Sequence, residues 1–200
     1  MKSIRHILAP VAFLIFAVPA TAEKLSLNVL SGYLNGLGTA RSAFTQINED
    51  GSRSTGQLLI RRPGGIRFEY SPPETSLVMA GGGQVAIFDS KSNQPPERFP
   101  LSKTPLNLIL ARNVDLGASN MVVGHASDET TTTVTAQDPK NPEYGSIQLV
   151  FTNNPTELRQ WIVTDGTGQQ TTVVLGDLKK GVNLQGTLFS IQREMRIRGF

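Results

Sequence analysis

The chain has 200 residues, with 19 Lys and Arg against 16 Asp and Glu, and it contains no cysteine. The lack of cysteine excludes disulfide bonds, thiol catalysis and thiolate metal sites. The net charge of +3 does not indicate a nucleic-acid ligand, because two of the basic residues lie in an N-terminal segment of the export type.

The first 22 residues are typical of a secretory signal peptide. Lys2 and Arg5 give a positively charged start, residues 7–18 form an apolar run, and Ala20-Thr21-Ala22 offers a small-residue cleavage site. Twelve apolar positions are too few for a retained membrane anchor, which needs about 20. We therefore expect 1–22 to be a cleaved signal peptide and 23–200 to be a single soluble periplasmic domain, with 17 basic and 16 acidic residues and a net charge of +1.

The first element of this domain is predicted to be a helix over residues 24–37. Leu27, Leu30 and Leu34 recur at spacings of three and four, which places them on one apolar stripe. Gly36 and Gly38 mark its end.

Short strands follow, separated by glycine and proline turns. Residues 57–62 alternate with Leu58, Ile60 and Arg62 on one face, and Ile66, Phe68 and Tyr70 share a face of the next strand. Further strands are expected at 77–80 and 84–89, on either side of the turn at 81–83. Short strands at this spacing indicate an antiparallel meander.

A second helix is expected at residues 105–112, with Thr104 as its N-cap and Pro105 in its first turn. The pattern then returns to period two at residues 130–137, 147–151, 161–163 and 173–175. These elements predict a mostly β fold with few helices, built on a single curved antiparallel sheet. Such a sheet either closes into a barrel or wraps only partly, in which case the helices lie over its opening as a lid. Both forms leave an apolar interior that suits an apolar ligand.

No motif in the sequence favours catalysis. His125 is the one histidine after the signal segment, which is too few for a multi-histidine metal site, and it is interpreted as a strand or surface residue. The glycines at 81–83 precede a strand and not a helix, so they indicate a hairpin turn and not a phosphate loop. Asp165 and Asp177 lie in turns that contain glycine, where aspartate is common for backbone reasons. We expect a protein that is not an enzyme and has no cofactor.

Arg62 is the one residue in a chemically unusual position. Alternation places its guanidinium on the same face as Leu58 and Ile60, at the edge of the expected apolar interior. A buried guanidinium must find carbonyls or a carboxylate, whereas a strand-end arginine can simply extend to water. Both interpretations stay open on alternation alone.

The sequence resembles the periplasmic outer-membrane lipoprotein carrier (LolA) family over nearly the whole predicted domain. The resemblance is carried by the order and spacing of several segments. These are Phe44-Thr45-Gln46, Gly56-Gln57-Leu58, Arg62-Pro63-Gly64-Gly65-Ile66, Val85-Ala86-Ile87-Phe88-Asp89, Thr104-Pro105-Leu106 and Leu158-Arg159-Gln160-Trp161.

The resemblance implies an unclosed β-barrel covered by an α-helical lid, with a hydrophobic cavity that shields the acyl chains of lipoproteins. It implies a monomer that takes lipoproteins from an inner-membrane ABC transporter and delivers them to an outer-membrane acceptor or to the outer membrane itself. The family's latch arginine falls on Arg62, its lid leucine on Leu34, and a cavity aromatic on Ile66, which is aliphatic here. Leu27, Leu30, Leu58, Ile60 and Phe68 complete the expected lid and cavity set.

Two other functions are compatible with the sequence. A periplasmic module of the same half-barrel fold could sense lipids or lipoproteins and regulate a partner, although such modules normally carry a second domain. A secreted hydrolase with an unrecognised site is the second alternative. Residues 193–200 depart from the family pattern, a C-terminal extension is not evident, and no role is assigned to that end of the chain.

Overall fold

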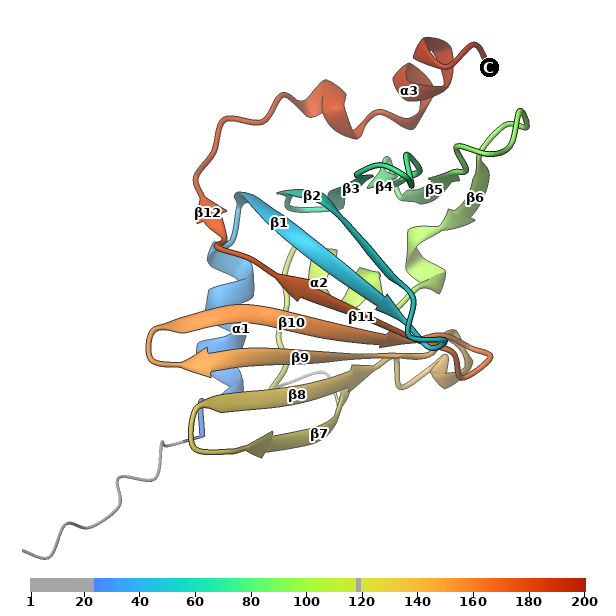
Figure 1. The fold of residues 1–200 in the computed structure, drawn as a ribbon. Coiled ribbons are helices and arrows are strands. Elements are labelled where there is room, and N and C mark those ends of the chain that lie inside the picture. The colour runs from blue at the N-terminus through green and yellow to red at the C-terminus, as the bar shows by residue number, and fades with distance from the viewer. Residues whose placement is uncertain (1–23, 118–119) are drawn as a thin grey trace, which may run out of the picture.

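The computed structural model describes residues 24–117 and 120–200, and the expected signal peptide at 1–22 lies outside this part of the chain. One twelve-stranded sheet dominates the fold (Figure 1). Along its main path the strands follow the order β6-β5-β4-β3-β2-β1-β11-β10-β9-β8-β7, and β12 pairs with β1. Every strand pairing is antiparallel. Since β6 and β7 end the path without pairing to each other, the sheet is curved but not closed.

The first half of the sheet is formed by β1 (Thr39–Asn48), β2 (Arg53–Arg61), β3 (Gly65–Tyr70), β4 (Leu77–Gly81), β5 (Gln84–Phe88) and β6 (Glu97–Pro100). The second half is formed by β7 (Val122–Ser127), β8 (Thr131–Gln137), β9 (Ser146–Asn153), β10 (Thr156–Thr164), β11 (Gln170–Leu175) and β12 (Lys179–Lys180). This arrangement confirms the predicted mostly β fold with a single unclosed antiparallel sheet.

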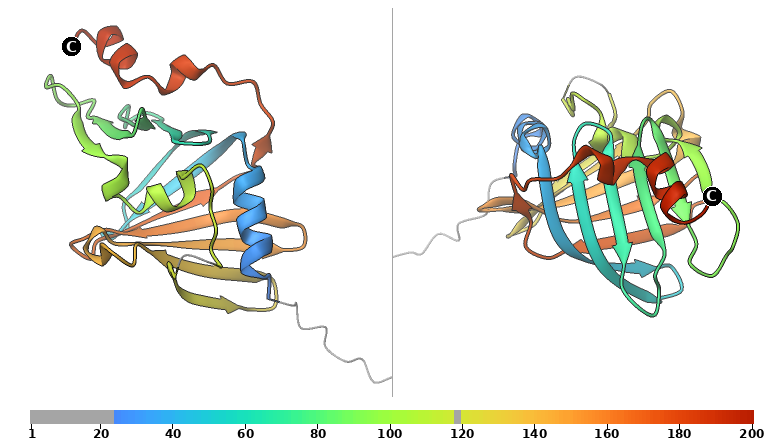
Figure 2. Two further views of the ribbon diagram at one scale, coloured as in Figure 1. Left: turned by 180° about the vertical axis from the view of Figure 1, so that it is seen from behind. Right: turned by 90° about the horizontal axis from the view of Figure 1, so that it is seen from above.

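Two helices lie on the concave face of the sheet: α1 (Leu27–Gly36) and the shorter α2 (Leu106–Leu110), which follows a 3-10 turn, η1 (Leu101–Lys103) (Figure 2). Helix α1 begins after Ser26, whose hydroxyl accepts a hydrogen bond from the amide of Val29. The expected cap of α2 was wrong. Pro105 occupies the N-cap position and makes no side-chain cap, while the Thr104 hydroxyl donates back to the carbonyl of Leu101.

The concave face carries the main hydrophobic core. Leu30 and Leu34 of α1 pack with Ile109 and Leu110 of α2 against inward residues of both halves of the sheet, including Trp161. Four ring pairs among the described residues meet edge to face in this core: Tyr33–Phe151, Phe44–Phe68, Phe44–Tyr70 and Phe68–Trp161. Such pairs add about 0.5–1.5 kcal/mol beyond the area they bury, so they stabilise the packing of this part of the concave face.

The convex face of β2–β5 is covered by the C-terminal end of the chain. After β12, residues 181–200 run across these strands through η3 (Gly186–Phe189) and α3 (Ile191–Ile197), as the view from above shows (Figure 2). We refer to residues 181–200 as the strap. Its apolar side chains bury Leu59, Leu77, Met79 and Phe88 from the outside. Because the strap covers this face, Leu58, Leu59 and Ile60 of β2 are all buried, although they alternate between the two faces.

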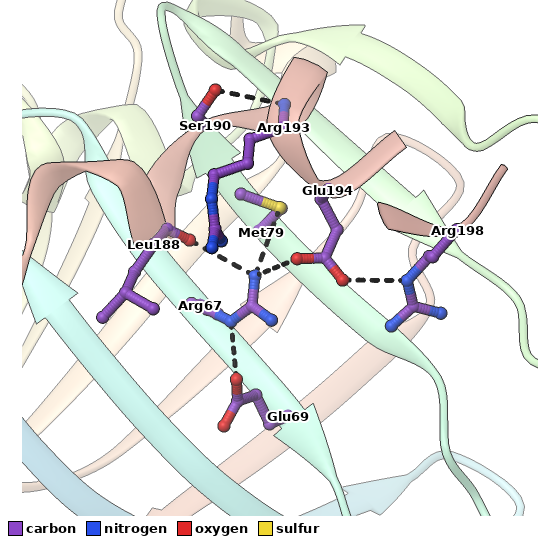
Figure 3. A network of polar contacts seen from close by, with 8 residues as sticks. All are labelled: Arg67, Glu69, Met79, Leu188, Ser190, Arg193, Glu194 and Arg198. Atoms are coloured by element: carbon purple, nitrogen blue, oxygen red, sulfur yellow. Dashed lines mark hydrogen bonds and ion pairs between the residues drawn. The ribbon is translucent and has the colours of Figure 1, made fainter. Parts of the chain in front are cut away.

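An ionic network centred on the buried Arg67–Glu194 pair fixes the strap to the sheet (Figure 3). Arg67 of β3 contacts the carboxylate of Glu194 at 3.0 Å and that of Glu69 at 2.6 Å, and it donates to the carbonyl of Leu188. Glu194 also accepts a hydrogen bond from Arg198. Burial alone raises the pKa of the Glu194 carboxyl, but hydrogen bonds from Arg198 and Arg67 outweigh this effect and hold the pKa below its ordinary value.

Candidate functional site

The two helices on the concave face are joined by polar contacts from α1 to the segment that follows α2. The side-chain amide of Asn35 donates to the carbonyl of Val114 at 2.8 Å and accepts from the amide of Val114 at 2.9 Å. The hydroxyl of Ser31 accepts from the amide of Leu116 at 2.9 Å. Ser31 and Asn35 are four residues apart and therefore share one face of α1. We refer to α1, η1, α2 and the segment up to residue 117 as the lid.

Arg62 connects the sheet to this lid. It directly follows β2, where its backbone amide donates to the carbonyl of Gly38 at 2.7 Å. Its Nη2 atom donates to the carbonyl of Ala111, at the C-terminal end of α2, at 2.6 Å and to Oδ1 of Asn35 at 3.2 Å. In the same turn, the amide of Gly64 donates to the carbonyl of Leu110 at 2.9 Å. The turn between β2 and β3 therefore holds the carbonyl end of α2, where positive groups are favoured.

The hydrogen-bonding capacity of Arg62 is only partly used. Its Nε and Nη1 atoms are shielded from solvent and have no hydrogen-bond partner among the described residues. Desolvation lowers the pKa of the guanidinium from its ordinary value. Because unsatisfied buried donors are costly, the net stabilisation that Arg62 gives to the closed lid is smaller than its two contacts suggest.

An apolar cavity of about 680 Å³ lies between the sheet and the lid. Phe68, Tyr70, Val78, Trp161 and Val173 form part of its wall on the sheet side, and residues 103–106 form part of the lid side. At the open edge of the sheet, Ile87 and Phe99 are 37% and 45% exposed and line the same space. The volume falls within the range of about 300–1,000 Å³ that is usual for sites that hold small apolar molecules.

Tyr70 brings a polar group to the sheet side of the cavity wall. The hydroxyl of Tyr70 donates to Oε1 of Gln46, which in turn donates through Nε2 to Asn48 at 2.8 Å. Burial and the nearby charge of Glu74 raise the pKa of Tyr70 to about 12. The phenol is therefore neutral at physiological pH, and the described cavity wall stays apolar apart from this group and charged side chains such as Lys103, Glu143 and Asp165.

The residues predicted as the lid and cavity set lie close together, but most of them do not line the open cavity. Leu30, Leu34, Leu58, Ile60, Ile66 and Phe68 belong to the one concave core, and Leu27 packs at its margin. Of these, only Phe68 reaches the cavity. The side chain of Arg62 extends to the concave side, as alternation predicted, and reaches lid groups.

Several residues of the site were missed from the sequence. Asn35 is the clearest, because it binds both the lid segment and Arg62, and its spacing of four from Ser31 is the signal that points to it. Tyr70 and Trp161 were placed in strands without a site role, yet both line the cavity.

The other candidates from the sequence have structural explanations. Nε2 of His125 lies 2.9 Å from the carbonyl of Leu25 and so attaches the start of the described chain to β7. Asp165 accepts hydrogen bonds from the amides of Thr167 and Gln169 within its turn. Gly82 and Gly83 form the β4–β5 turn with positive φ. Within residues 24–117 and 120–200, no group of three or more His, Asp or Glu side chains is arranged to hold a metal ion.

No helix in the described part of the chain has the length and apolar character needed to cross a membrane. The fold and site together define a class of protein: an unclosed β half-barrel whose helical lid covers an apolar cavity. The family model of the outer membrane lipoprotein carrier protein LolA matches residues 35–192, so the chain belongs to this family.

Curated relatives support the assignment at low identity. An outer-membrane lipoprotein carrier protein of Chromohalobacter salexigens is 27% identical, covering 96% of this chain and 94% of the relative. One of Azotobacter vinelandii is 24% identical, with 93% and 92% covered. Among solved structures, a LolA superfamily protein from Nitrosomonas europaea aligns with a TM-score of 0.46 at 12% identity, covering 83% of this chain and 98% of that one.

Proposed function

We propose that this member of the LolA family carries lipoproteins through the periplasm and shelters their acyl chains in the cavity between lid and sheet. It receives cargo from an inner-membrane ABC transporter and delivers it to an outer-membrane acceptor or to the outer membrane itself. The observation that carries the proposal is the apolar cavity of about 680 Å³, which is open at Ile87 and Phe99 and bounded by a lid held through a few hydrogen bonds.

The energetics require such a lid. Each methylene of an acyl chain that leaves water contributes about 0.8 kcal/mol, so one chain in the cavity binds tightly. A carrier must also release its cargo, which requires a closed empty state of comparable stability. The contacts of Arg62 with Ala111 and Asn35 stabilise that closed state, and its unsatisfied Nε and Nη1 atoms limit the stabilisation so that the lid can still open.

Competition binding tests the proposal. The protein should bind an apolar fluorescent probe, and an acylated lipoprotein should displace it, whereas the same polypeptide without its acyl chains should not. Ile87→Asp places a charge on the cavity wall and should weaken probe binding by about tenfold or more. Val174→Asp is the matched control, because Val174 is equally exposed at 36% and lies outside the cavity lining. Equal displacement by acylated and non-acylated cargo would contradict the proposal.

A further inference from the structure

A second hollow lies at the opposite end of α2 from the cavity. It is a groove of about 490 Å³ formed by the β2–β3 and β4–β5 turns, the C-terminal end of α2 and the strap. Its described lining residues include none of those that line the cavity. The site that holds cargo and this groove are therefore separate surfaces that share the lid.

Two arginines line the groove without partners. Arg61, at the end of β2, and Arg112, just after α2, are exposed, and neither guanidinium has a hydrogen-bond or ion-pair partner among the described residues. The described lining includes no Asp or Glu. Arg62, the next residue after Arg61, is bound to Asn35 and Ala111 of the lid and does not line the groove. Two exposed guanidinium groups beside a lining without described acids produce a positive potential that favours an anionic partner.

The groove is shaped for an extended chain more than for a single ion. Gly64, Gly82 and Gly83 present backbone without side chains, and a Cβ atom on any of them would meet nothing within 4 Å, so another backbone can approach closely. The strap positions one of the arginines: a Cβ atom on Gly186 would lie 3.0 Å from Nη1 of Arg61, so the guanidinium lies directly against the strap backbone. Pro63 and Phe189 add apolar groups to the groove lining.

We propose that this groove is a docking site for an acidic segment of a partner protein, held by Arg61 and Arg112. Guanidinium groups bind carboxylates through two parallel hydrogen bonds, which gives the contact both strength and direction. The docked segment contacts the lid at Arg112, one residue beyond the carbonyl of Ala111 that Arg62 binds. A partner in the groove is thus in direct contact with the end of the lid that Arg62 binds, whether or not the cavity contains cargo.

The test uses the protein purified from the periplasm after expression of the full chain, without cargo, so its failure leaves the proposed function standing. An octapeptide of glutamate is titrated while amide chemical shifts are recorded by NMR, with an octapeptide of glutamine as the neutral control. The amides of Gly64, Gly82, Gly83 and Gly186 should shift with the glutamate peptide only. The variant with both Arg61→Ser and Arg112→Ser should bind the glutamate peptide at least about tenfold more weakly.

The matched control is Arg53→Ser, which removes an exposed arginine from the far end of β2. The affinity of this variant for the glutamate peptide should stay within about twofold of that of the unsubstituted protein, because salt screens the long-range effect of one exposed charge. An equal loss in Arg53→Ser, or no shift at the groove glycines, would overturn the proposal. Sedimentation with phosphatidylglycerol vesicles is the second arm. Vesicle binding that needs Arg61 and Arg112, without any peptide binding, would assign the groove to a lipid headgroup instead and would also overturn it.

Discussion

Nη2 of Arg62 and Oδ1 of Asn35 lie 3.2 Å apart, although 27 residues separate them along the chain. The same Oδ1 accepts the amide of Val114, and Nδ2 of Asn35 donates to the carbonyl of Val114. One asparagine thus connects α1, the segment after α2 and the arginine at the end of β2. It is the point at which the lid is fixed both to itself and to the sheet.

Replacing Asn35 should open the lid. Asn35→Leu removes three hydrogen bonds and should destabilise the closed state by about 1–2 kcal/mol, which raises the affinity for an apolar probe roughly tenfold. Hydrogen exchange at the amide of Val114 should accelerate. Asn35→Asp keeps the acceptor for Arg62 and for the Val114 amide, so it should show a smaller effect. Unchanged exchange at Val114 in Asn35→Leu would show that these contacts do not hold the lid.

The Arg67–Glu194 pair should be essential for the strap. Both side chains are 10% exposed. Arg67→Met removes the contacts with Glu194, Glu69 and the Leu188 carbonyl and leaves the Glu194 carboxylate with Arg198 alone, so it should lower the free energy of unfolding by about 1.5–3 kcal/mol. Arg193→Met is the control, because Arg193 is an exposed residue of α3 with no ion-pair partner among the described residues, and it should cost less than about 0.5 kcal/mol. Urea unfolding measures both. Equal stability of the two variants would mean that the apolar contacts of the strap hold it on the sheet without the ion pair.

Attachment of the strap should also depend on pH. The pKa of Glu194 is lowered in the folded protein, so the stability that its charge contributes is present above the ordinary pKa of 4.5 and is lost as the pH falls through the folded value. Limited proteolysis of the strap should therefore accelerate as the pH drops below 4.5, with an acid-stable protease as the reagent. Glu194→Gln should be cleaved faster at neutral pH and should lack the pH dependence. A Glu194→Gln profile identical to that of the unsubstituted protein would remove Glu194 from this role.

Gly81 should tolerate no side chain. A Cβ atom there would overlap the carbonyl oxygen of Phe189, so Gly81→Ala must displace the strap from the β4–β5 turn. We expect a loss of about 1–3 kcal/mol, measured as a lower Tm. Gly32→Ala is the control, because a Cβ atom in that position of α1 meets nothing within 4 Å. It should be neutral or should stabilise by up to about 1 kcal/mol, since alanine favours helix.

The sheet was largely predictable because apolar and polar residues alternate clearly in most of its strands, and Gly and Pro turns bound these strands. β1 was not identified individually, although it is at the centre of the sheet, because its inward residues Ala40 and Ser42 are small or polar and weaken the period-two pattern. The two-residue β12 gives no pattern at all. The ends of the helices differed from the predicted ones by one to three residues, as capping geometry decided them.

The strap could not be predicted. Residues 193–200 contain three arginines and one glutamate, which locally indicate an exposed tail. Glu194 is buried only because Arg67, 127 residues earlier, reaches it from the sheet. The same limit applied to the site. Alternation placed Arg62 on the concave side, but the role of Asn35 depends on residues 114–116 returning to α1, which no local pattern encodes.

The most direct test of the carrier account is transfer of a labelled, acylated lipoprotein from the loaded protein to outer-membrane vesicles. The unsubstituted protein should load and release it. Arg62→Leu should load it but retain it, because the change removes the donors to Ala111 and Asn35 and adds apolar surface on the concave side. A charge-assisted hydrogen bond contributes about 1.5–3 kcal/mol, enough for at least tenfold tighter retention. Arg62→Lys should give a milder defect, since an ammonium lacks the planar fork. Failure of the unsubstituted protein to load, or normal release by Arg62→Leu, would contradict the account.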